Sequence, residues 1–121
     1  MTDFEALYRR DPDPWSVRSA WYERRKRALL MAALPRERYG LALELGSGTG
    51  ETTRQLAARC DAVRAVDLSA TAVETSRRVL SADGLANVDV NVMCLPDAWP
   101  LGEREQADLI VVSELAYYFD D

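Results

Sequence analysis

An α/β fold built on a parallel sheet is predicted by the order of apolar segments along this chain of 121 residues. Apolar runs at 41–45, 62–68, 88–93 and 108–113 have the length and composition of strands, and segments with helical periodicity separate the first three. Strands that alternate with helices form parallel sheets with right-handed crossovers. Such sheets bind ligands outside the carboxyl ends of their strands.

Two helices are expected before the first strand. Residues 3–10 have the pattern of a short helix. A second helix is predicted from Pro14, with Asp13 as its N-cap, to about Ala33, because Pro35 cannot continue it. These two helices would form an N-terminal segment ahead of the sheet.

The remaining elements each have a local reason. The run 41–45 is almost continuously apolar, as in a buried strand, and Ser69 is placed to cap the helix that follows the second strand. The run 88–93 alternates strictly, which is typical of a strand with one wet face. The run 108–113 is continuously apolar, and we expect it to be buried on both faces.

Composition excludes several classes of function. A net charge of −5 disfavours binding to nucleic acid, and the basic run 24–27 is expected to form solvated surface. No apolar stretch is long enough to span a membrane, and the acidic N-terminus does not resemble a signal peptide. The chain has no histidine, so a Ser-His-Asp triad and a histidine metal site are excluded. Cys60 and Cys94 lack metal-type spacing, and we expect two buried thiols in a cytoplasmic protein with no metal.

Residues 44–53, ELGSGTGETT, place three glycines at the end of the first strand. A phosphate-binding P-loop needs Lys and Ser or Thr after its last glycine, where this chain has Glu51 and Thr52. A dinucleotide-binding fingerprint needs its third glycine at position 51, and a glutamate there would repel a pyrophosphate. Asp67 follows Gly50 by 17 residues and could accept both hydroxyls of a ribose, a role that it could equally have toward NAD.

The pattern E-x-G-x-G-x-G resembles the first motif of the class I S-adenosylmethionine-dependent methyltransferases. The blocks DPDPW, WYERRK, LPDAWP and DLIVVSELAYYF are similar to the nodulation protein S-like methyltransferases over essentially the whole chain. This resemblance implies a Rossmann-like sheet of strand order 3-2-1-4. It also implies methyl transfer from S-adenosylmethionine to a small-molecule nucleophile such as an amine, as in the family's namesake, which N-methylates a chitooligosaccharide.

The resemblance also implies a set of cofactor-binding residues: Trp15, Lys26, Glu44, Gly46, Ser47, Gly48, Gly50, Asp67, Leu68, Cys94 and Leu95. Trp15, Tyr22 and Lys26 have the spacing of one helical face and could cover a nucleoside, although core packing with a solvated lysine explains them equally well. Cys94 stands where the family usually has an adenine-binding Asp. Either Asp97 or the backbone replaces that contact, or adenine is held less firmly.

Catalysis by such an enzyme consists mainly of alignment, because a sulfonium methyl group is already electrophilic. An amine acceptor attacks only when neutral, so a base helps. Glu114 is the first candidate, followed by Tyr117 and Tyr118, although Glu114 could equally be an exposed carboxylate at a helix start.

We therefore divide the chain into an N-terminal helical lid, 1–36, and a cofactor-binding Rossmann-like half-domain, 37–121. A fifth strand and its covering helix are not found in the sequence, so we expect an incomplete catalytic domain whose fourth strand pairs with a second copy or a partner chain. Two alternatives are a part of a methyltransferase that binds cofactor without activity and, less favoured, an NAD-dependent oxidoreductase.

Overall fold

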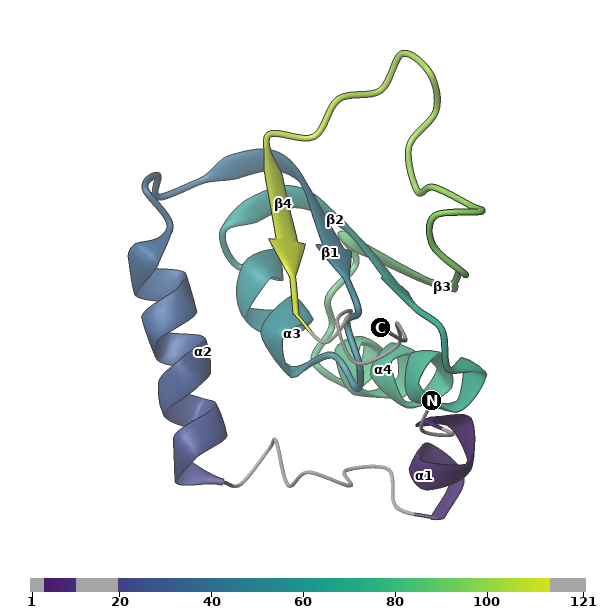
Figure 1. Cartoon of the computed structure of the whole chain (residues 1–121). Coiled ribbons are helices and arrows are strands. Elements are labelled where there is room, and N and C mark those ends of the chain that lie inside the picture. The colour runs from purple at the N-terminus through teal and green to yellow at the C-terminus, as the bar shows by residue number, and fades with distance from the viewer. Residues whose placement is uncertain (1–3, 11–19, 114–121) are drawn as a thin grey trace.

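The structure of the protein, a computed structural model, describes residues 4–10 and 20–113. A four-stranded parallel sheet forms its centre, in the order β3-β2-β1-β4 (Figure 1). The strands are β1, Tyr39–Leu45; β2, Cys60–Asp67; β3, Val88–Val92; and β4, Leu109–Val112. The predicted fold class and strand order are confirmed.

Within these described ranges, four helices accompany the sheet, and the two that connect its strands, α3 and α4, lie on the same face (Figure 1). The helices are α1, Phe4–Arg10; α2, Trp21–Ala33; α3, Glu51–Ala57; and α4, Ala70–Ala82. α2 packs against α3, and α1 packs against α4. The α4 N-terminus is capped as predicted, because the Ser69 hydroxyl accepts a hydrogen bond from the backbone N–H of Ala72.

The second predicted helix is shorter than expected. It ends at Ala33 as Pro35 requires, but Ala20 has extended backbone angles, so no single helix continues through this position. Of the three residues for which we expected a shared helical face, Tyr22 and Lys26 both lie on α2, and Trp15 lies outside the described residues. The basic run is mostly exposed as predicted, but Arg27 is buried on the inner face of α2.

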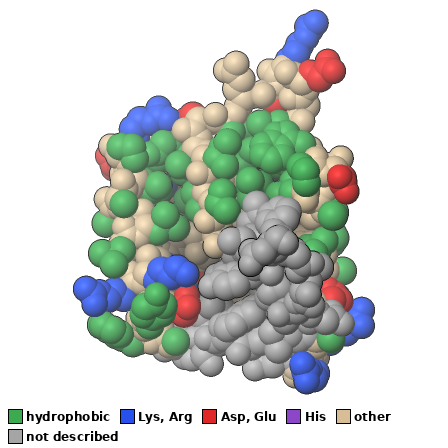
Figure 2. Space-filling model, viewed as in Figure 1, with side chains coloured by type: hydrophobic (Ala, Val, Ile, Leu, Met, Phe, Trp, Pro, Cys, Tyr) green, Lys and Arg blue, Asp and Glu red, His purple; other side chains and the backbone are tan. Residues whose placement is uncertain are grey.

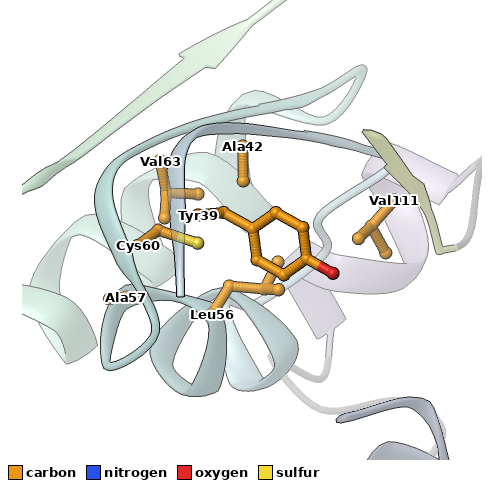
Figure 3. Packing of buried hydrophobic residues seen from close by; sticks show 7 residues of the cluster. All are labelled: Tyr39, Ala42, Leu56, Ala57, Cys60, Val63 and Val111. Carbon is orange, nitrogen blue, oxygen red and sulfur yellow. The ribbon is translucent and has the colours of Figure 1, made fainter. Parts of the chain in front are cut away.

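The core between the sheet and α3 is formed by apolar residues of three strands (Figure 3). The Tyr39 ring lies among the side chains of Leu56 on α3 and Val111 on β4. A second cluster joins Val73 and Leu80 of α4 to β2 and β3. These contacts fix α3 and α4 against the sheet and thereby place the strand ends that carry the site.

The opposite face of the sheet is covered by the segment between β3 and β4. Leu95, Leu101 and Ala107 of this segment pack with Met93 on Leu43, Leu45 and Val66. Figure 2 shows that apolar side chains gather on the upper part of the face in view.

β4 is one of the two edge strands of the described sheet, and it is less buried than predicted. Val111 is buried, but Ile110 and Val112 are 52% and 58% exposed. The prediction of burial on both faces is wrong for the described residues, because none of their elements covers these two side chains. The prediction of buried thiols is confirmed for Cys60, which is buried, and is wrong for Cys94, which is exposed.

Among the residues that the structure describes, none of the helices has both the length and the apolar character needed to cross a membrane.

Candidate cofactor-binding site

The glycine loop, residues 46–50, follows β1 directly and packs against the end of the neighbouring strand β2. Gly46, Gly48 and Gly50 have φ angles of +76°, +58° and +92°, a left-handed region that favours glycine. The backbone N–H groups of Gly46 and Ser47 donate hydrogen bonds to the Val66 carbonyl oxygen, at 2.9 and 3.0 Å. The loop is therefore held across the carboxyl ends of β1 and β2, the position at which such sheets bind ligands.

Gly50 also brings α3 and α4 into close contact. A Cβ atom at this position would lie 2.6 Å from the Ser76 Oγ on α4. Ser76 is fully buried, so its side chain cannot turn out to solvent. The third glycine is thus required by both its backbone angle and its neighbour.

Asp67 is the second predicted feature, and the structure brings it to the glycine loop. Its Oδ2 accepts a hydrogen bond from the Gly48 N–H at 2.8 Å, and its Oδ1 accepts one from the Ser69 N–H at 3.0 Å. The residue is only 2% exposed. Asp67 therefore joins the glycine loop to the start of α4.

Glu44 is buried beneath the loop. The Thr53 hydroxyl of α3 donates a hydrogen bond to its Oε1, and the Ser113 hydroxyl, just after β4, donates to its Oε2 at 2.9 Å. Glu44 is 0% exposed, and it links β1 to α3 and to the end of β4. This linking role was not predicted, since neither hydroxyl stands next to Glu44 in the sequence. A contact between Glu44 and the cofactor stays a prediction.

The hydroxyl of Ser47 has no hydrogen-bond partner, although Ser47 is only 6% exposed. Buried polar atoms are normally paired, so an orphaned hydroxyl in a ligand-type loop is a group that a bound molecule could satisfy. The described residues contain no group of three or more His, Cys, Asp or Glu side chains that could hold a metal ion.

The other predicted site residues are less closely gathered. Lys26 is exposed on α2, Leu68 is 39% exposed just after β2, and Cys94 is exposed after β3. Leu95 is half-buried in the cluster on the opposite face of the sheet. Four further candidates lie outside the described residues: Trp15, Glu114, Tyr117 and Tyr118.

Comparison with known families gives one match that covers nearly the whole chain. The family model of nodulation protein S (NodS) matches residues 3–121. A nodulation protein S from Rhizobium tropici is 30% identical over 110 residues, which are 90% of this chain and 44% of that protein. The chain spans about half the length of the curated relatives that it matches.

Solved structures agree with the fold. A candidate methyltransferase from Pseudomonas syringae is similar with a TM-score of 0.71 and 48% identity, over 84% of this chain and 61% of that chain. The N-methyltransferase NodS from Bradyrhizobium japonicum, solved with S-adenosylhomocysteine, has a TM-score of 0.80 at 23% identity, over 99% of this chain and 61% of that chain.

Proposed function

This chain belongs to the nodulation protein S family, and we propose that it binds S-adenosylmethionine and serves methyl transfer to a small-molecule nucleophile, with an amine as the favoured acceptor. The observation that carries the proposal is the hydrogen bond between the Gly48 N–H and Asp67. It joins a glycine loop and a buried carboxylate at the ends of adjacent parallel strands. The Bradyrhizobium japonicum relative with bound S-adenosylhomocysteine supports the choice of cofactor.

The first turn of α3 favours S-adenosylmethionine over a dinucleotide as the cofactor. Glu51 begins α3, and its carboxylate forms an ion pair with Arg54 at 3.2 Å. A helix N-terminus that receives a pyrophosphate offers its N–H groups to a dianion, which a glutamate in the same turn would repel. S-adenosylmethionine carries an ammonium group and no phosphate, so Glu51 is compatible with it.

The groups that would bind the cofactor lie at the carboxyl ends of β1 and β2. Asp67 would accept the ribose hydroxyls, the glycine backbone would lie against the methionyl part, and the Ser47 hydroxyl would gain a partner. S-adenosylmethionine supplies an activated methyl group when bound. We further propose that the N-terminal lid, 1–36, encloses the cofactor through Trp15 and Lys26.

On the acceptor side, we propose the Glu114 carboxylate as the group that receives the amine proton, with Tyr117 as the second candidate. Cys94 and Leu95 would face the adenine. Since the net charge is −5, a small acceptor is favoured over a nucleic acid.

The fourth strand is proposed to pair with a second copy or a partner chain, because an apolar edge invites pairing. Light scattering that gives a stable monomer over a range of concentrations, together with clear methyl transfer by this chain alone, would refute this pairing.

Calorimetry with S-adenosylhomocysteine tests the proposal. Asp67→Ala should lose two charge-assisted hydrogen bonds and about 2–4 kcal/mol of binding free energy. Asp61→Ala is the matched control, because Asp61 is an exposed residue of the same strand that pairs with Arg38. Equal affinity of both variants and the unchanged chain would contradict the proposal.

Two further measurements separate the alternatives. Binding of NAD in place of S-adenosylhomocysteine would favour the oxidoreductase. Tight cofactor binding without transfer of a radiolabelled methyl group to any of a panel of amines would favour a binding module that is inactive by itself.

A further inference from the structure

The N-terminal helix contributes a carboxylate to the first turn of α4. Glu5 Oε1 accepts hydrogen bonds from the backbone N–H of Thr71 at 3.2 Å and from the Thr71 hydroxyl at 2.5 Å. α1 and α4 lie side by side (Figure 1). Two side chains therefore accept hydrogen bonds from the first backbone N–H groups of α4. Ser69, the N-cap, binds the Ala72 N–H, and Glu5, which is 66 residues before Thr71, binds the Thr71 N–H.

The charged form of Glu5 is the one that this position holds. The first backbone N–H groups of a helix have no partners within it, and a negative charge is favoured there. Burial alone would raise the pKa of Glu5, but hydrogen bonds from Ser69 and Thr71 and the positive charge of Arg9 lower it below its ordinary value. The Glu5 carboxylate thus connects α1 to the first turn of α4 in its charged form.

The first turn of α4, to which Glu5 is bound, also donates a hydrogen bond to Asp67. The Ser69 N–H donates to Asp67 Oδ1, and the Ser69 hydroxyl accepts from Ala72 within the same turn. A shift of this turn would move the Ser69 N–H, which together with the Gly48 N–H holds the Asp67 carboxylate.

We propose that Glu5 is a positioning residue for the cofactor site: by holding the first turn of α4 it orients Asp67, so that ribose binding depends on the docking of α1. The inference rests on the proposed function. It assigns to α1 a role in affinity that needs no contact with the cofactor. By linkage, a bound cofactor should in turn strengthen the docking of α1.

A double-mutant cycle tests the inference with S-adenosylhomocysteine as the probe. Glu5→Ala should weaken binding by about fivefold or more, and Glu5→Gln, which retains an acceptor oxygen, should recover part of the loss. Glu74→Ala is the matched control, because Glu74 is an exposed glutamate on α4 that pairs with Arg78. In an Asp67→Asn background, Glu5→Ala should cause no further loss.

The outcomes are distinct. If the unchanged chain does not bind the probe, the proposed function fails. If it binds and Glu5→Ala binds equally well, the inference is overturned. An equal loss in both backgrounds also overturns it, because Glu5 would then act independently of Asp67. If Glu5→Ala does not fold, Thr71→Val, which removes the hydroxyl donor, replaces it in the cycle and is judged by the same outcomes.

Discussion

Replacement of Gly50 by alanine should destabilise the protein for two separable reasons. Gly50 precedes α3 with a φ of +92°, and a non-glycine residue in the left-handed region costs about 1–2 kcal/mol. The new Cβ atom would also lie 2.6 Å from the Ser76 Oγ, and overpacking of a buried contact costs about 1–3 kcal/mol. The expected loss in the free energy of unfolding is therefore about 2–5 kcal/mol.

Gly84 provides the matched control, because it follows α4 with a φ of +71° and a Cβ atom added there would meet no other atom within 4 Å. Gly84→Ala should show only the backbone cost, about 1–2 kcal/mol. Urea denaturation of both variants measures the difference, which isolates the steric contact with Ser76. Ser76→Ala should remove much of the extra loss in Gly50→Ala, although the Ser76 Cβ at 3.3 Å leaves a tight contact.

Equal destabilisation of Gly50→Ala and Gly84→Ala would refute the reasoning, since the steric part would then be absent. The same conclusion would follow if Ser76→Ala failed to relieve the Gly50→Ala variant. Either result would mean that α3 and α4 are not packed as closely at this point as the structure places them.

Three further changes have defined outcomes. Arg77 donates hydrogen bonds to a backbone carbonyl of β3, an edge strand, at 2.9 and 2.5 Å, so Arg77→Ala should increase self-association in light scattering while Arg78→Ala does not. Hydrogen bonds from the Arg64 side chain and from the Gly102 N–H lower the pKa of Glu105 to about 2. The contribution of Glu105 to stability is therefore present above the ordinary pKa of a glutamate and is lost as the pH falls toward 2. Acid denaturation of Glu105→Gln should lack this part of the pH dependence, and an unchanged profile would contradict the assignment. Lys26→Ala should weaken S-adenosylhomocysteine binding with little change in melting temperature if the lid encloses the cofactor, whereas a change in stability alone would support a packing role.

The sequence predicted features that depend on near neighbours. Pro35 ends α2, Ser69 caps α4, and the alternating run at 88–93 forms a strand. The site also followed from the sequence in outline, since Gly48 and Asp67 stand at the ends of adjacent strands and parallel strands place these ends together.

Tertiary structure alone decided the contacts between residues that are distant in the sequence. The pairing of Glu44 with Thr53 and Ser113 and the contact of Glu5 with Thr71 have no local signature. Periodicity and capping report on about one or two turns of chain, because they reflect the hydrogen bonds and the face of a single element. Which side chains share a buried space is set by how whole elements pack on one another, and that information becomes available only once the chain has folded.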